Sequence, residues 1–535
     1  MANELNKDDS NFNLEQSKDE NETKNINDKI DEIESESDED LPFNDSEPII
    51  EQILNNYGYG KHIWKVIVLS LLLIFVIGIH SYYFTVIFIP ARKFFELTNM
   101  QTSVLASSVY LGTALGSVIS GYLSHYFCRV FNICTCLAGI IYLDIGVCLF
   151  LNIYVFTVLR ILIGILLGII GPMAVGFLSE TLPTKNRSFF IVFSSIGYPL
   201  GAVFVAAMAL IIMPNFETHQ LKVILLAIIQ PVIIIFLLCI VFLQNSPRAL
   251  LLRHEDEEAF QFLSKLTRSR KEFSQEIKNK IIKQVRECEM NSVKPEISSL
   301  FSPHLLFTSV CLVILYSLAF LISNGTRNVM TLTFETSETH IKPTARQNII
   351  ELLTVHGISV IGYFLAGFTS DIKLLGRKST IAIGFAIMSI TMLVACILRK
   401  KMSIFLAILN FFLPFTIRVM SVYSCEVYPS KIKDIANGFY GMIGKVMAFL
   451  SSFIFVALAG PSKYLPYYVT IALSIVCLIL VLILPYETHG RPLDVNLLEY
   501  EKEVIDASST EELPKPINLM EKEDEEKLML QSKNK

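Results

Sequence analysis

Twelve long apolar runs dominate this sequence of 535 residues. A helix rises about 1.5 Å per residue, so a run of twenty-odd residues can cross the roughly 30 Å of hydrocarbon in a bilayer. Backbone groups in lipid must be paired within a helix or a closed barrel, and runs that lack period-2 alternation favour helices. The runs lie at about 64–89, 102–123, 131–151, 155–178, 188–213, 221–243, 304–324, 348–370, 379–398, 402–425, 436–459 and 465–485. The sequence therefore predicts an all-α polytopic membrane protein with twelve transmembrane helices.

Composition agrees with this prediction, because 52% of the residues are hydrophobic and only 18% are charged. Much of the acid is gathered at the two ends, in segments with few aromatic residues that cannot bury enough apolar surface to fold. The predicted organisation is an acidic cytosolic tail at 1–60, a six-helix bundle at 61–243, a cytosolic central loop at 244–303, a second six-helix bundle at 304–485 and a cytosolic tail at 486–535.

Orientation follows from the distribution of basic residues. An even number of crossings puts both tails and the central loop on one side, and the central loop is rich in Lys and Arg, which indicates the cytosol. The short loops are less informative, and they place Arg327 outside, beside the sequon that begins at Asn324. Whether the membrane is the plasma membrane or that of an internal organelle is left open.

Two loops, SETLPTKNRS and CEVYPSKIKD, match at identical spacing and indicate an internal repeat. The matching positions are Glu180, Pro183 and Arg187 in the first half and Glu426, Pro429 and Lys433 in the second. Each half thus places one acid and one base at its cytosolic rim. We expect Glu180 to reach Lys433, and Glu426 to reach Arg187, as pairs that hold a cytosolic gate shut. The alternative is separate exposed charges, each worth a fraction of a kcal/mol.

A second loop, GFTSDIKLLGRK, contains Asp371, Gly376, Arg377 and Lys378, and its charged residues, together with Glu487, are further candidates for the cytosolic gate. It resembles the G-x-x-x-D-…-G-R-[RK] loop of the major facilitator superfamily, and RILIG, which begins at Arg160, resembles that superfamily's R-x-x-x-G signature. NYGYGKHIWKV, NSPRALLLRHEDEEAFQFLSKL and PYETHGRPL, which contains Glu487, are similar to stretches of the sugar-porter, organic-ion-transporter and synaptic-vesicle-glycoprotein-like branch. The resemblance spans about 57–493 and implies two six-helix pseudo-repeats that transport a solute.

Ionisable residues inside membrane spans are costly and are functional hypotheses by default. Five are candidates for a substrate or coupling site: His80, Asp144, Arg160, Arg418 and Lys445. By resemblance, helices 1, 4, 7 and 10 line the transport path, and organic-anion members carry a base where Lys445 stands. His80 is the candidate whose charge would switch near neutral pH. The alternative is that Arg160 pairs with Asp144 and that Arg418 snorkels or binds helix carbonyls.

These observations favour a secondary or facilitative transporter of a small polar organic solute that works by alternating access, with an organic anion preferred and a sugar or organic cation next. Expected partners are the solute, the lipid bilayer and a coupled proton or other ion. A receptor or scaffold that no longer transports is the alternative, because His125 and Cys128 replace the acid and glycine expected in the first-half loop. The sequence contains no motif for an enzyme, a cofactor, a metal or nucleic acid.

Overall fold

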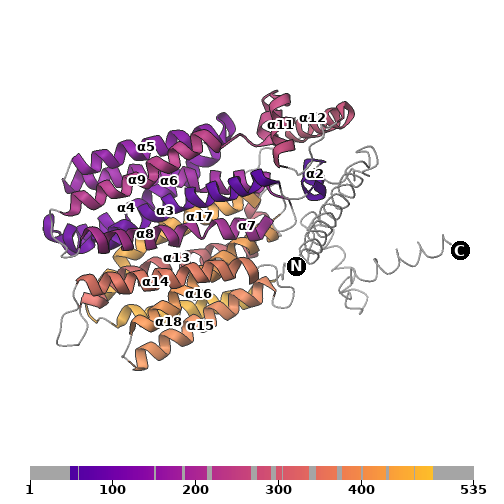
Figure 1. The fold of residues 1–535 in the computed structure, drawn as a ribbon. Helices are drawn as coiled ribbons and strands as arrows, with labels where there is room; N and C mark the ends of the chain where they lie inside the picture. Colours follow the sequence, from indigo (N-terminus) through magenta and orange to yellow (C-terminus); the bar gives the residue numbers. More distant parts are fainter. Residues whose placement is uncertain are drawn as a thin grey trace, which may run out of the picture. The chain divides into compact units, whose positions relative to one another are not determined.

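The computed structural model describes residues 49–57, 60–149, 152–183, 187–213, 220–266, 274–290, 297–303, 305–335, 345–369, 376–398, 402–428, 433–462 and 464–485. The described chain is built of helices (Figure 1). The helices of the first half that cross the membrane are α3 (Lys61–Phe94), α4 (Asn99–Tyr126), α5 (Arg129–Leu149), α6 (Ile153–Thr181), α7 (Arg187–Ser194) with α8 (Gly197–Ile212), and α9 (Gln220–Phe242). Those of the second half are α13 (Leu306–Glu335), α14 (Ala345–Thr369), α15 (Arg377–Leu398), α16 (Met402–Val427), α17 (Lys433–Ala459) and α18 (Leu465–Ile483).

Twelve stretches of the described chain are helices long and apolar enough to cross a membrane, which confirms the predicted fold class. Large apolar side chains such as Tyr142, Leu149 and Ile397 are exposed, at 77%, 70% and 70%, as expected of surfaces that face lipid. Two boundaries differ from the sequence prediction. The fifth crossing is divided between α7 and α8, and the seventh continues as helix well beyond residue 324.

Glycines allow helices of the first half to pack with their backbones almost in contact. A Cβ on Gly112 or Gly116 of α4 would lie 2.1 or 2.0 Å from a carbonyl oxygen of α6, and Gly164 and Gly168 of α6 meet α4 in the same way. This is the arrangement that small residues four apart produce between membrane helices. A Cβ on Gly197 of α8 would likewise lie 2.2 Å from a carbonyl oxygen of α3.

The two halves contact each other through two equivalent pairs of helices. The second helix of the first half, α4, packs against α17, which is the fifth crossing of the second half. Reciprocally, the second crossing of the second half, α14, packs against α8 in the fifth crossing of the first half. An internal duplication with a pseudo-twofold relation between its copies would produce this pattern.

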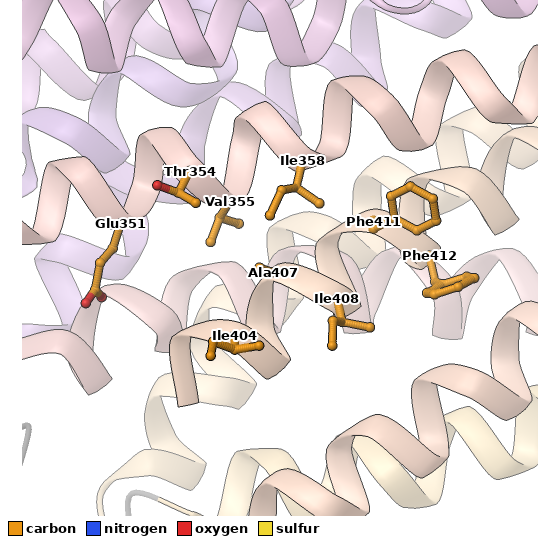
Figure 2. A pocket seen from close by; sticks show the side chains of 9 residues that line it. All are labelled: Glu351, Thr354, Val355, Ile358, Ile404, Ala407, Ile408, Phe411 and Phe412. Carbon is orange, nitrogen blue, oxygen red and sulfur yellow. The ribbon is translucent and has the colours of Figure 1, made fainter. Parts of the chain in front are cut away.

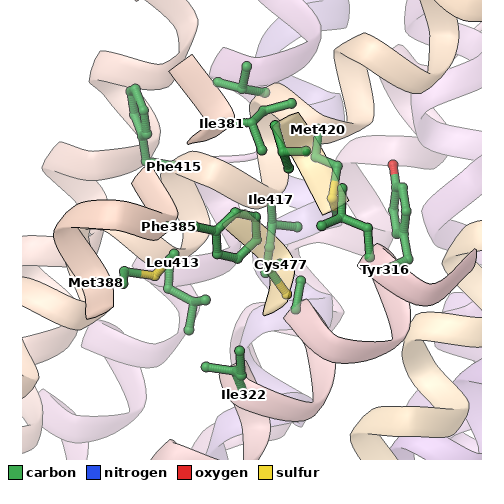
Figure 3. Packing of buried hydrophobic residues seen from close by; sticks show 14 of the residues in the cluster. Tyr316, Ile322, Ile381, Phe385, Met388, Leu413, Phe415, Ile417, Met420 and Cys477 are labelled. Carbon is green, nitrogen blue, oxygen red and sulfur yellow. The ribbon is translucent and has the colours of Figure 1, made fainter. Parts of the chain in front are cut away.

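The second half has its own apolar core (Figure 3). Phe385 and Met388 of α15 pack there with Leu413 of α16 and Cys477 of α18, and all four side chains are almost completely buried. Polar bonds reinforce the end of α16, where the Tyr428 hydroxyl bonds to both Ser309 and Tyr440. This core fixes α13, α16 and α17, which carry Arg327, Arg418 and Lys445.

A smaller compact unit is formed by the described residues within 1–68, 177–187 and 242–293, and the division falls within α3, α6 and α9. Its helices are α2 (Ile49–Tyr57), α10 (Pro247–Leu252), α11 (Asp256–Leu266) and α12 (Gln275–Met290). Arg286 of α12 donates two hydrogen bonds to the carboxylate of Asp256, at 2.9 and 3.1 Å. The Gln284 side chain accepts from the backbone N–H of Ile49 at 2.9 Å, so the central polar segment is a folded element that includes part of the N-terminal region. A short 3₁₀ helix, η2 (Ile297–Phe301), precedes α13 in the larger unit.

Candidate functional site

Three of the predicted residues come together in the interior of the first half. Nε2 of His80 on α3 lies 3.5 Å from a carboxylate oxygen of Asp144 on α5, and these side chains are 0% and 8% exposed. Arg160 of α6 is also buried, and its Nε donates to the hydroxyl of Ser108 on α4 at 3.3 Å. Its guanidinium lies 4.5 Å from the ring centroid of Tyr83, one helical turn after His80 on α3.

Arg160 does not form the direct ion pair with Asp144 that was the alternative prediction. Among the described residues, the carboxylate of Asp144 has His80 within ion-pair distance and not Arg160. The guanidinium of Arg160 instead lies against aromatic rings, and its two terminal nitrogens are buried without hydrogen-bond partners. A cation over an aromatic face gains about 0.5–2 kcal/mol, which offsets part of the cost of burying it.

A second cluster joins the two halves around Arg327 of α13. The guanidinium donates through Nη1 to the hydroxyl of Tyr110 on α4 at 3.1 Å and to the side-chain oxygen of Asn324 at 3.0 Å. Its Nη2 donates to the hydroxyl of Ser323 at 3.3 Å. The guanidinium also lies 4.6 Å from the ring centroid of Tyr82 on α3. Arg327 is only 8% exposed, and all of these partners are electrically neutral.

Two aromatic neighbours complete this cluster. The ring of Tyr82 makes edge contacts with Tyr198 of α8 at 5.2 Å and with His356 of α14 at 4.5 Å between centroids. His356 is 3% exposed, and its Nδ1 has no hydrogen-bond partner among the described residues. We call Tyr82, Tyr110, Tyr198, Arg327 and His356 the Arg327 cluster.

Sequence reasoning placed Arg327 in an outer loop, and this was wrong. The seventh crossing was predicted to end where polar residues begin, but α13 continues through them because they are largely buried inside the protein, where Arg327 bonds to Tyr110 of the other half, and do not face lipid. Asn324, at 4% exposure within the same helix, is therefore not available as a glycosylation site. His356 lies inside a predicted crossing, so the rule that singles out ionisable residues in membrane spans could have found it.

The remaining candidates inside the spans are Lys445 and Arg418. Lys445 of α17 is partly exposed, and its Nζ donates to the backbone carbonyl of Thr113 on α4 at 3.4 Å. Arg418 of α16 lies over the ring of Tyr363 on α14, 5.2 Å from its centroid, and its Nε is buried without a hydrogen-bond partner. Arg418 thus stacks on a ring of its own half and does not snorkel to the membrane edge.

The predicted cytosolic gate is described only in part. Asp371 and Glu487 lie outside the described residues, as do the side chains of Glu426 and Lys433, so the expected pairs of the matching loops stay predictions. Nη2 of Arg187 donates to the carbonyl of Leu182 at 3.3 Å, at the turn that separates it from Glu180.

The loop with the G-R-K sequence begins α15. Gly376 adopts a φ of 65°, a conformation that glycine reaches without strain, which explains its place immediately before the helix. The side chain of Arg377 is buried, and Nζ of Lys378 donates to the carbonyl of Leu484 at the end of α18, at 2.6 Å.

A groove of about 350 Å³ lies between α14 and α16 (Figure 2). Its walls are apolar side chains such as Ile358, Ile408 and Phe412, with Glu351 at one end. Such a lining suits acyl chains better than a polar solute, and the groove contains none of the clustered charges. The described residues also contain no group of three His, Cys, Asp or Glu that could hold a metal ion.

Comparison with known proteins agrees with this architecture. The chain is 25% identical over 463 residues to the synaptic vesicle 2-related protein of Xenopus laevis, and the aligned region covers 83% of this chain and 82% of that protein. It is 24% identical over 463 residues to organic cation/carnitine transporter 7 of Arabidopsis thaliana, covering 75% and 87%. A shorter match of 174 residues, 25% identical, links it to the gallate transporter of Pseudomonas putida, covering 32% and 38%.

Solved structures show the same fold. The proton:xylose symporter XylE, bound to 6-bromo-6-deoxy-D-glucose, superposes with a TM-score of 0.66 at 17% identity, covering 81% of this chain and 98% of that one. The inward open conformation of XylE from E. coli gives a TM-score of 0.63 at 16% identity, with the same coverage. The sugar (and other) transporter model matches residues 5–496. The chain therefore belongs to the sugar (and other) transporter family of the major facilitator superfamily, as a multi-pass integral membrane protein.

Proposed function

We propose that this chain is a secondary transporter that moves a small organic anion across the membrane as its two six-helix halves alternate in access. The family supports transport of a small solute in general, and the choice of an anion rests on the charges of the interior. In this proposal the tails and the central segment are cytosolic, and the boundaries between the tails, bundles and central segment are those predicted from the sequence.

An excess of buried positive charge carries the proposal. Among the described residues, Asp144 is the one buried carboxylate, and it lies against His80. Arg160 and Arg327 are 1% and 8% exposed, and neither has a carboxylate within ion-pair distance in the described chain. Charge buried without an opposite partner is expensive, so an anionic solute would bind where it neutralises that charge. An organic cation would increase the electrostatic cost of the buried positive charge.

Uptake into proteoliposomes tests the proposal. Purified protein is assayed with anionic, neutral and cationic solutes of similar size, beside an Arg160→Gln variant and a Lys222→Gln variant as a matched loss of charge at an exposed site on α9. We expect uptake of an anion that falls at least tenfold in Arg160→Gln and is unchanged in Lys222→Gln. Transport restricted to neutral sugars or to cations would refute the choice of an anion, and binding without transport would favour the receptor alternative.

We further propose that the pair His80 and Asp144 couples transport to protons. The pair is buried with 3.5 Å between its facing atoms, which make no hydrogen bond in this conformation, and the cation of Arg160 lies in the same cluster. Binding or release of one proton would change the net charge of this cluster and so the stability of each conformation. Replacing Asp144 by Asn should abolish accumulation driven by a pH gradient but preserve exchange of labelled for unlabelled solute. Accumulation that survives in Asp144→Asn would place coupling elsewhere.

A further inference from the structure

Two cations of the second half reach the same stretch of one helix in the first half. Arg327 of α13 donates to the hydroxyl of Tyr110, and Lys445 of α17 donates to the carbonyl of Thr113, and both acceptors are on α4. Three residues along a helix correspond to about 4.5 Å of rise and leave the two positions about 60° apart around the axis. The two cations therefore meet one side of α4 from two different helices.

Neither cation is neutralised in the described chain. The partners of Arg327 are two hydroxyls and one amide oxygen, and its Nε has no hydrogen-bond partner. Lys445 uses one of its three donors, for a backbone carbonyl at 3.4 Å, and its side chain keeps some accessible surface. Both cations are thus able to accept an anionic partner without first breaking an ion pair.

We propose that Arg327 and Lys445 form a two-point site for a small dicarboxylate, with one carboxylate bound at each cation. This inference rests on the proposed transport of an organic anion and names the substrate class. A monocarboxylate would leave one of the two cations without a counter-ion, and a neutral sugar would leave both. Two anionic groups on one short chain suit two cations that bond to positions three residues apart on α4.

The groups around Arg327 suit a carboxylate. Tyr110 and Ser323 now accept hydrogen bonds from the guanidinium, but each hydroxyl also carries a hydrogen that it can donate. An entering carboxylate would accept from the guanidinium and from these rotated hydroxyls. A carboxylate would bring a compensating charge and could accept two parallel hydrogen bonds from the guanidinium, which the neutral hydroxyls cannot, so this exchange favours the bound anion. Because Arg327 and Tyr110 belong to different halves, the exchange would also release a bond that now joins them.

The test measures binding to the purified full chain and exchange in proteoliposomes, with succinate, butyrate and succinamide as probes. These share a four-carbon chain and carry two, one and no charges. We expect succinate to bind at least tenfold more tightly than butyrate, and succinamide not to bind. Lys445→Gln should bind succinate and butyrate about equally, with its affinity for butyrate within twofold of that of the unsubstituted protein. Arg327→Gln should lose both anions.

Controls separate this inference from a folding defect and from failure of the proposed function. Arg327→Lys keeps the charge, so it should retain weakened binding of succinate even if Arg327→Gln does not fold. Lys222→Gln should leave the succinate-to-butyrate ratio unchanged. Equal binding of succinate and butyrate by the unsubstituted protein, or binding of neither, would overturn the two-point site. Transport of another anion in that case would leave the proposed function standing, whereas transport of neutral or cationic solutes alone would overturn both.

Discussion

Replacing Gly112 by Ala should destabilise the first half measurably, because the added Cβ has no room. It would lie 2.1 Å from the carbonyl oxygen of Ile161, whereas ordinary contact begins at 3.4 Å. The backbones of α4 and α6 must therefore separate locally by about 1.3 Å, the difference between these distances. Overpacking of this kind costs about 1–3 kcal/mol. Backbone atoms on the opposing helix cannot move aside as a flexible side chain can, so we expect a value within this range.

Gly121→Ala is the matched control on the same helix, because a Cβ at Gly121 would meet no described atom within 4 Å beyond the backbone of its own helix. Both substitutions gain the same preference of Ala over Gly for the helical state, so the difference between them isolates the clash. The assay is the apparent Tm of the purified protein in detergent, with all variants heated at one rate. We expect Gly112→Ala to melt at least about 2 °C below Gly121→Ala. Equal melting temperatures would refute the reasoning that α4 and α6 touch through their backbones.

Two further predictions concern contacts outside the candidate site. Asp256→Ala should destabilise the smaller unit by about 1 kcal/mol, because it removes the two hydrogen bonds that Arg286, whose side chain is 31% exposed, donates to the carboxylate. High salt should reduce the difference. Protease sensitivity of the central segment in low and high salt measures this, and equal sensitivity of the two proteins would contradict it. Lys378→Met should lower the apparent Tm, because Nζ of Lys378 donates to the carbonyl of Leu484 at the end of α18. Lys378→Arg should restore much of this loss, and equal Tm values for the Met and Arg variants would show that the bond contributes little.

The fold followed from the sequence more completely than the site did. Runs of twenty apolar residues determine the number and type of crossings, because lipid leaves the backbone no alternative to a helix. Arg160, His80 and Asp144 were found because each interrupts such a run. The contacts among these three side chains were not predictable, because they depend on which face each of α3, α5 and α6 presents to the others. That orientation is set by helix packing.

Arg327 was missed for a different physical reason. Hydropathy treats every residue of a span as if it faced lipid, so a polar stretch is taken as the end of the crossing. In this chain the stretch from Ser323 to Arg327 is largely buried inside the protein. Gly325 lies against Phe455 of α17, and Arg327 reaches Tyr110 and Tyr82 of the other half. Hydropathy can therefore predict the length of a crossing whose residues face lipid. It underestimates the length of a helix whose polar residues are buried against other helices.

Two sides of α4 make contacts of different kinds. Gly112 is held against α6 of its own half at backbone contact, while Tyr110, about 160° away around the axis, bonds to Arg327 of the other half. The first contact cannot loosen without losing its packing, whereas the contacts of α4 with the other half, which are its packing against α17 and the bonds from Arg327 and Lys445, include long flexible side chains. Any displacement between the halves should therefore be absorbed on the Tyr110 side, and α4 should move as a rigid body together with α6.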